Sequence, residues 1–174
     1  MLCVIEAIAA VLVLAVLVIY MFIKNQGDAE ILLEVDKRTA SVKVSENGKR
    51  VDFEVEIPYR NVGKQEGTIL DTYMRIYLPQ EQYDDVLLRG KVNLKDVKRD
   101  DDYFEAVLVP AKTGRTLLLR FEAYAKNGKT IAEAMAGIPD VDVALYADCR
   151  GRGPLFTVKK FLTLSADEMR ALVK

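Results

Sequence analysis

Residues 51–63 read VDFEVEIPYRNVG. Over the first seven of these positions, apolar residues alternate strictly with acidic residues. A period of two is the signature of a β-strand that buries one face and exposes the other to water. The tripeptide Asn61-Val62-Gly63 then ends the alternation with residues that favour turns. The stretch therefore predicts a long strand in a sheet that is covered on one side.

Shorter alternating runs, separated by turn residues, flank this strand on both sides. We expect strands near residues 31–35, 42–44, 70–78, 86–97, 104–108, 117–123, 143–147 and 156–164. The run over residues 86–97 is less regular and fits one bent strand or two. Asn47-Gly48 and Asn127-Gly128 are typical of two-residue hairpin turns, whose backbone needs positive φ. The pattern predicts a mainly β fold, an antiparallel β-sandwich with immunoglobulin-like arrangement.

Two capping boxes predict short helices within this β region. Thr130 lies three residues before Glu133, and Ser165 lies three residues before Glu168. In such a box the first side chain caps the helix, and the acidic side chain returns to the cap. We therefore expect one short connecting helix that ends at Gly137, and a short C-terminal helix.

The N-terminal segment has a different pattern, because Glu6 is its only charged residue between Leu2 and Ile23. As a helix these residues would span about 33 Å, enough to cross the hydrocarbon layer of a bilayer. No basic region precedes them and no small-x-small cleavage site follows before Lys24, which favours an uncleaved single-pass anchor over a signal peptide. The expected organisation is an anchor (residues 1–24), a juxtamembrane linker (residues 25–29) and a β-sandwich domain (residues 30–174).

The orientation of this membrane protein depends on the charges beside the anchor. Lys24, Lys37 and Arg38 follow the apolar segment and, taken alone, favour a cytoplasmic domain. Acidic residues are interleaved with them. Sandwich domains on single anchors commonly lie outside the cytoplasm, so by analogy an extracytoplasmic domain is our expectation.

Residues 53–63, FEVEIPYRNVG, resemble the strand that ends in Asn-x-Gly in immunoglobulin-like and fibronectin type III-like modules of bacterial and archaeal surface proteins. The resemblance implies a membrane-anchored sandwich of the prokaryotic envelope. The chain lacks the paired cysteines and the core tryptophan of antibody-type domains. The partners of that subfamily are therefore not carried over.

Glu6 is an ionisable group about one turn inside an apolar helix. It can reach the membrane interface, where the positive end of the helix would favour it. Residues 2–6, LCVIE, followed by an apolar helix, also resemble the mature start of a type IV pilin, whose glutamate pairs with the N-terminal amine of a neighbouring subunit. That resemblance implies a filament subunit with Glu6 at a helix-helix or subunit contact. Against it, no leader ending in glycine precedes Leu2, and the helix is expected to stop near Gly27.

The composition argues against most kinds of catalysis. Histidine is absent, which removes the usual general base and the Ser/His and Cys/His nucleophile pairs. Cys3 and Cys149 cannot form a disulfide within the domain, and neither has the spacing of a metal ligand. The residues after Ile23 carry equal numbers of basic and acidic groups, which gives no field for nucleic acid. We expect a non-enzymatic protein without cofactor; an enzyme that uses a carboxylate pair is a third hypothesis.

Three groups of residues remain as candidate sites. Asp100, Asp101 and Asp102 offer oxygen ligands, but a calcium loop spaces its ligands, so a solvated turn is preferred and cation binding stays open. Tyrosines on solvent faces can form a contact patch, although tyrosine is also an ordinary strand residue. Arginines between glycines can hold an anion or simply form a polar loop. The candidate contacts for an unknown envelope or protein partner are Tyr77, Tyr83, Tyr124, Tyr146, Arg150 and Arg152.

Overall fold

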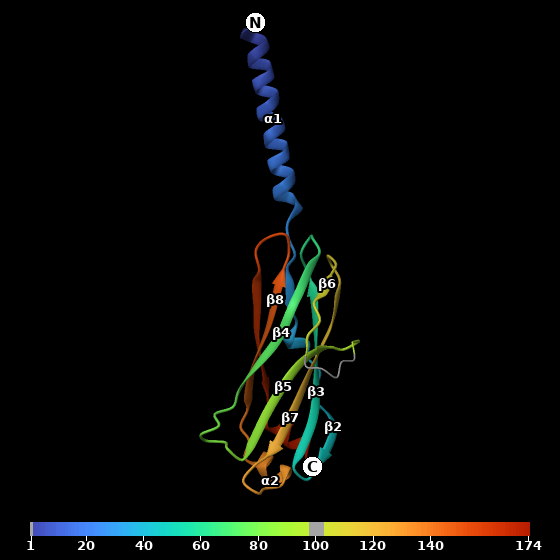
Figure 1. Cartoon of the computed structure of the whole chain (residues 1–174), viewed down its shortest axis with the longest axis vertical. Helices are drawn as coiled ribbons and strands as arrows, with labels where there is room; N and C mark the ends of the chain where they lie inside the picture. Colours follow the sequence, from blue (N-terminus) through green and yellow to red (C-terminus); the bar gives the residue numbers. More distant parts are fainter. Residues whose placement is uncertain (1, 98–102) are drawn as a thin grey trace.

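The computed structural model describes residues 2–97 and 103–174 (Figure 1). The cation candidates Asp100, Asp101 and Asp102 lie outside the described residues. The helical elements are α1 (Leu2–Gln26), the 3-10 turn η1 (Val35–Lys37), α2 (Ile131–Ala136) and α3 (Ala166–Ala171). The strands are β1 (Ile31–Leu33), β2 (Val42–Asn47), β3 (Arg50–Asn61), β4 (Gly67–Tyr77), β5 (Val86–Leu94), β6 (Val107–Val109), β7 (Gly114–Ala125), β8 (Val141–Arg150) and β9 (Phe156–Leu164).

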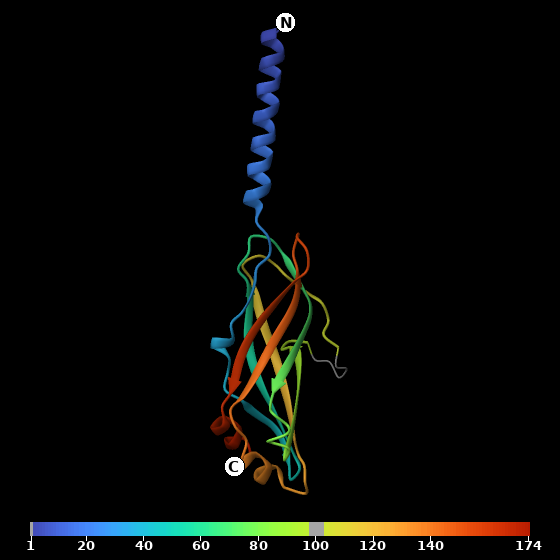
Figure 2. The ribbon, with the colours of Figure 1, turned by 90° about the vertical axis from the view of Figure 1, so that its left-hand side faces the viewer.

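Helix α1 extends from one end of the β-domain, along the direction of its long axis in both views (Figures 1 and 2). Its described apolar side chains are exposed, for example Ile8 at 56% and Tyr20 at 61%. The stretch Ile8–Gln26 is long and apolar enough to cross a membrane by length and composition, and none of it is buried. A core helix would bury one apolar stripe. Helix α1 therefore does not belong to the core of the domain.

The strands form two antiparallel sheets. In sheet A the order is β1-β3-β7-β5, and β2 also pairs with β3, farther along the same edge. In sheet B the order is β6-β4-β8-β9. Strands β2, β3, β7 and β5 correspond to A, B, E and D of the constant-type immunoglobulin plan, and β4, β8 and β9 to C, F and G. The prediction of a mainly β, immunoglobulin-like sandwich is confirmed.

The core lies between the sheets, as the alternation in residues 51–63 predicts. Val51, Phe53 and Val55 are fully buried, while the acids between them lie on the outer face. Phe53 pairs across the strands with Phe121 of β7, and their rings stack with centroids 5.0 Å apart. Aromatic pairs of this kind add to the stability that apolar burial provides. The same alternation leaves each sheet with an outer face, and these two faces carry the candidate surface sites.

Both predicted short helices are present, with different caps. Helix α2 has the full capping box, in which Thr130 and Glu133 bond reciprocally. Ser165 caps α3 through the backbone of Glu168, but the Glu168 carboxylate does not return to the cap. It accepts two hydrogen bonds from Arg38, at 2.9 and 2.8 Å, and one from the backbone of Ser41. The second predicted box is therefore half formed, because its acid joins α3 to the segment before β2.

The predicted hairpins require corrections. Asn47 and Gly48 do begin a tight β2–β3 turn, but Gly48 does not have positive φ. Instead the Asn47 side chain accepts the Lys49 amide at 3.0 Å and closes the turn locally. Asn127 and Gly128 have the expected positive φ, 51° and 77°, but they connect β7 to α2 and form no hairpin.

The bounds of the predicted strands also require corrections. Val35 lies in η1 and not in the first strand. Of the two alternatives for residues 86–97, the single strand is confirmed: it is β5, which ends at Leu94. The strand predicted at residues 104–108 is shorter and later than expected, because β6 covers only Val107–Val109. The predicted run at residues 42–44 belongs to β2, whose residues are all exposed, so its valines do not enter the core.

Candidate functional site

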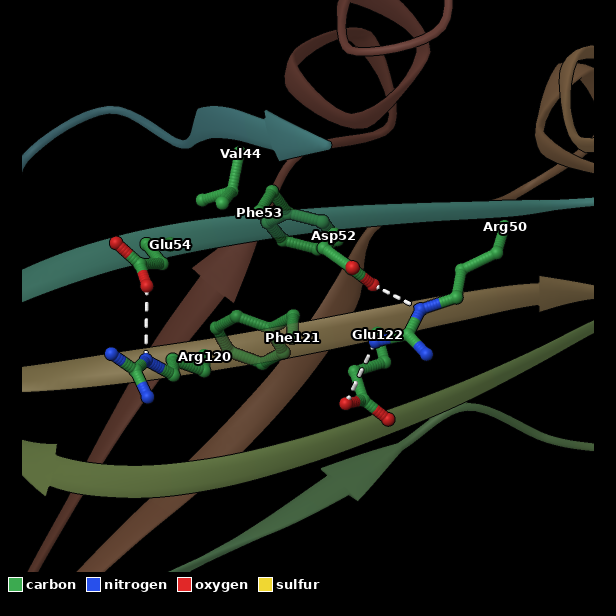
Figure 3. Close-up of a pocket in the computed structure, with 8 residues that line it drawn as sticks. All are labelled: Val44, Arg50, Asp52, Phe53, Glu54, Arg120, Phe121 and Glu122. Carbon is green, nitrogen blue, oxygen red and sulfur yellow. Dashed lines mark hydrogen bonds and ion pairs between the residues drawn. The ribbon is translucent and has the colours of Figure 1, made fainter. Parts of the chain in front are cut away.

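The outer face of sheet A carries a network of ion pairs around a shallow pocket of about 250 Å³ (Figure 3). Arg50 bonds to Asp52 beside it on β3 and, at 3.0 Å, to Glu122 on β7. Arg120 on β7 bonds to Glu54 on β3 at 2.9 Å. The aromatic side chains of the core and Val44 of β2 complete the lining. Every charged side chain that lines this pocket therefore has an opposite partner on the same face.

The electrostatics of this pocket favour the ionised form of Asp52. Partial burial acts to raise the pKa of Asp52, but hydrogen bonds from Arg50 and Ser45 lower it below its ordinary value. The hydrogen bond to Asp52 raises the pKa of Arg50. A general acid for glycoside hydrolysis needs a carboxyl whose pKa is raised, so Asp52 is unsuited to that role.

Tyr124 belongs to the same ion-paired face. Its hydroxyl donates to Glu122 at 2.9 Å, and this bond raises the pKa of Tyr124. The guanidinium carbons of Arg50 and Arg89 lie 5.0 and 5.9 Å from the centre of its ring. Both its polar and its aromatic surfaces are thus already in contact with neighbours.

The outer face of sheet B is aromatic. Tyr73 of β4 stacks on Tyr146 of β8, with ring centroids 4.8 Å apart and planes 6° apart. Tyr77 of β4 lies 6.2 Å from Phe161 of β9, measured between centroids. The Lys159 ammonium lies 5.2 Å from the Tyr146 ring centre and 4.6 Å from that of Phe161. We call these five residues the aromatic patch.

The aromatic patch combines ordered rings with exposure to water. Tyr73, Tyr77 and Phe161 are 39%, 47% and 55% exposed. Hydrogen bonds with Lys159 and Tyr77 lower the pKa of the Tyr146 hydroxyl. Such rigid, half-exposed rings with a cation beside them are the groups that protein interfaces favour.

The six residues predicted as partner contacts fall in separate places. Tyr77 and Tyr146 lie together in the aromatic patch, whereas Tyr124 lies on the opposite sheet. Tyr83 is half-buried against the core in the β4–β5 connection. Arg150 and Arg152 lie at the end of the domain nearest α1.

The six predicted contacts omit three members of the patch: Phe161, Lys159 and Tyr73. A signal for Phe161 existed, because apolar residues recur at the even positions 156, 158, 162 and 164, and Phe161 does not fit that alternation. Lys159, one residue after Val158, shares the outer positions of β9 with Phe161.

The linker between α1 and β1 is held by two loops of the domain. The Asp28 carboxylate accepts the backbone amides of Arg152 and Gly153, at 2.8 and 3.0 Å, and that of Ala29. These bonds, with that of Arg152 first, lower the pKa of Asp28. A Cβ added at Gly151 would collide with this carboxylate. The β8–β9 loop therefore needs glycine there in order to approach the linker.

The Asn-x-Gly sequence at residues 61–63 holds the other side of the linker. The buried Asn61 amide donates to the carbonyls of Gln65 and Val109 and accepts the amides of Glu30 and Gly63. A Cβ at Gly63 would collide with the backbone of residues 28–30. In this protein the sequence therefore fastens the linker to the β3–β4 loop.

Glu6 lies on α1 with its side chain exposed, outside the sandwich. Because α1 begins at Leu2, Glu6 belongs to the first turns of the helix, whose N-terminal end is the end away from the sandwich in Figures 1 and 2. Its expected role in a helix-helix or subunit contact stays a prediction.

No protein-family model matches the chain, and no curated protein sequence matches it. Among solved structures it is similar to the GAE domain of yeast GGA1, with 8% identity and a TM-score of 0.37, over 74% of this chain and 98% of that one. For the GAE domain of GGA2p from Saccharomyces cerevisiae the values are 9% and 0.31, over 72% and 97%. For a structural genomics target named SoR45 they are 13% and 0.37, over 81% and 87%. Similarity at this level carries no argument about function, and the fold assignment rests on the strand order.

Proposed function

We propose that this chain is a membrane-anchored interaction protein that presents the aromatic patch to a protein partner. The observation that carries the proposal is the patch itself, four rings and an ammonium group on the outer face of sheet B. Stacked rings are already ordered, so little side-chain entropy is lost when a partner covers them.

The charges around the patch indicate the chemistry of the partner. Lys159 and the exposed Arg75 of β4 offer positive charge beside the rings. The acids on the same face already accept hydrogen bonds: Asp142 and Asp148 each from a threonine of β9 at 2.6 Å, and the exposed Asp71 of β4 from the Thr72 amide at 2.7 Å. The patch therefore suits a protein surface with apolar side chains flanked by carboxylates.

The anchor in this proposal is α1, with the bilayer in contact with its residues 2–23. Its support is an apolar surface all around the helix and the absence of burial along Ile8–Gln26. We further propose that the domain lies outside the cytoplasm. In a Cys3→Ser background, a cysteine placed at exposed Lys126 should then react with a membrane-impermeant maleimide in intact cells, while buried Cys149 stays unlabelled. Labelling of residue 126 only after lysis would reverse the orientation.

The interaction is tested with the full chain, tagged at its C-terminus and solubilised from its own membranes. We expect a defined partner to be recovered with the wild type and lost with the double variant Tyr146→Ser/Phe161→Ser. The matched control is Tyr124→Ser, the same change on the opposite sheet, which should retain the partner. Equal recovery with all three proteins would place the interaction elsewhere and refute the role of the patch.

A variant of Glu6 distinguishes the filament hypothesis from a simple membrane anchor. Glu6 is exposed on an apolar helix that packs against neither sheet. If α1 only anchors the chain, Glu6→Gln leaves the amount of membrane-bound protein unchanged. In a filament, a carboxylate buried against a neighbour's amine would be needed, and its loss typically costs about 3 to 5 kcal/mol. Sheared extracellular fibres in the wild type that disappear in Glu6→Gln would favour the filament subunit.

A further inference from the structure

Three loops surround the point where the linker enters the sandwich: residues 62–66, 110–113 and 151–155 (Figures 1 and 2). Exposed basic residues gather in these loops, next to them and at the end of α1. We call these residues the basic rim: Lys24, Lys64, Lys112, Arg150 and Arg152.

The acids at this end do not cancel the basic rim. Asp28 is turned to backbone amides, which occupy both of its carboxylate oxygens. Glu30 and Glu66 are exposed acids in the linker and the β3–β4 loop. The five basic groups of the rim therefore outnumber these three acids, and both carboxylate oxygens of Asp28 are already hydrogen-bonded to backbone amides.

Hydrogen bonds fix the position of the basic rim relative to the C-terminal end of α1. The Lys64 ammonium donates to the main-chain and side-chain oxygens of Asn25, at 3.3 and 3.2 Å. The Gln65 side chain donates to the Gln26 carbonyl at 3.1 Å, and Arg152 donates to the Gln26 side chain. The rim is therefore held against the two residues that follow the apolar segment and Lys24.

If α1 spans a bilayer, the basic rim lies at the level of the lipid headgroups. A helix rises about 1.5 Å per residue, so Gln26 lies only about 5 Å beyond Ile23. The polar layer on each side of the hydrocarbon is roughly 5 to 8 Å thick. Groups that bond to Asn25 and Gln26 consequently lie within this layer.

We propose that the basic rim binds the anionic headgroups of the bilayer and holds the sandwich upright on the membrane. The proposal rests on the proposed anchor and adds a second contact to it. Basic side chains beside a membrane are attracted to anionic lipids at short range. On the β8–β9 loop, Leu155 is 56% exposed and supplies an apolar contact at the same depth. An upright sandwich keeps the aromatic patch at a fixed height above the membrane.

The test uses the full chain in nanodiscs, with an environment-sensitive fluorophore on Leu155→Cys in a Cys3→Ser background. The discs contain phosphatidylcholine alone or with phosphatidylglycerol, and a quencher is attached to some headgroups. We expect quenching to be at least roughly twofold stronger in the anionic discs and to weaken in 0.5 M salt, where charges are screened within a few ångströms.

Two variants make the result specific. Lys112→Glu/Arg150→Glu reverses two rim charges whose side chains, in the described part of the chain, are not bonded to the linker, and should reduce quenching to the level in neutral discs. Lys126→Glu/Lys174→Glu makes the same change in charge at exposed positions nearer the opposite end, and should leave quenching unchanged. Quenching that is equal in both kinds of disc, or equal in both variants, would overturn the rim proposal while leaving the anchor intact. Failure of the wild type to enter discs would overturn both.

Discussion

The two sheets of this sandwich have outer faces of opposite character. On sheet A the outward positions are charged, and Arg50, Arg120 and their acids are bonded to one another. On sheet B the outward positions include four rings as well as charged residues, and the Lys159 ammonium contacts the rings of Tyr146 and Phe161. Both faces are solvent-exposed surfaces of the same antiparallel fold, so the fold does not require the difference.

The difference shows what each face offers to another molecule. Binding on sheet A would first have to separate ion pairs that are already satisfied, and this would offset much of the gain. Binding on sheet B would cover apolar surface that now faces water, which is favourable without breaking any such pair.

The largest effect is expected from a charge reversal on the aromatic patch. Lys159→Glu removes the cation between two rings and places a carboxylate where the proposed partner carries its own acids. Opposed like charges in an interface cost several kcal/mol, so affinity should fall by about 100-fold or more. Titration of the purified partner by calorimetry measures this.

The matched reversal lies on the other face. Arg120→Glu changes the charge equally but leaves the patch intact, so the affinity should stay within about threefold of wild type. If Arg120→Glu weakened binding as much as Lys159→Glu, net charge and not the patch would govern the interaction.

The second effect concerns an ion pair that is more protected from water than those of sheet A. Glu168 is bonded to Arg38 and Ser41. Partial burial acts to raise its pKa, but these bonds lower it to about 2. Because the folded pKa lies below the ordinary value of 4.5, ionised Glu168 stabilises the fold at neutral pH, and this contribution disappears as the pH falls from about 4.5 towards 2.

Glu168→Gln should therefore lower the free energy of unfolding by about 1 to 2 kcal/mol at pH 7, and by less as the pH approaches 2. Denaturant unfolding of both proteins at several pH values measures the difference. A constant difference over this range would mean that charge is not what stabilises the junction between α3 and the segment before β2.

The sequence predicted the strands and caps but not the contrast between the faces. Strict alternation assigned Asp52 and Glu54 to an outer face, because inside and outside follow from a period of two. Which strands share a face depends on strand order, which arises from pairing between distant segments. Tyr124 was therefore grouped with Tyr77 and Tyr146, although β7 pairs with β3 and β5 and not with β8.

Dipeptide patterns also failed to predict which loop residues have positive φ. Positive φ was expected at Gly48, where the Asn47 side chain closes the turn without it. It was not expected at Lys112, which has φ of 62° and donates its amide to the Asn61 carbonyl. That bond joins loops from different parts of the sequence, so no short motif contains it.

The third effect is the stability that ring stacking provides on sheet B. Tyr73→Ser removes the ring that stacks on Tyr146. Because both rings lie on the outer face, the free energy of unfolding should fall by only about 0.5 to 1.5 kcal/mol. Thermal and denaturant unfolding measure it, with Tyr73→Phe as the control that keeps the stack. A loss above about 3 kcal/mol would assign the patch to the core and weaken its role as a contact surface.

The smallest effect is expected from a single ion pair on sheet A. Arg120→Gln removes the bond to Glu54, whose side chain is 28% exposed, while that of Arg120 is 41% exposed. Water can solvate the remaining carboxylate, and both side chains recover rotamer freedom, so the free energy of unfolding should change by no more than about 0.5 kcal/mol. A double-mutant cycle with Glu54→Gln isolates the pair, and the coupling should shrink further in 1 M salt, where exposed charges are screened. A coupling above about 2 kcal/mol that persists in salt would show that the charges of sheet A stabilise the fold as a core does. The proposed contrast, in which the ion-paired face of sheet A is a solvated surface and the aromatic face of sheet B is available for binding, would then be wrong for sheet A, whatever the aromatic patch binds.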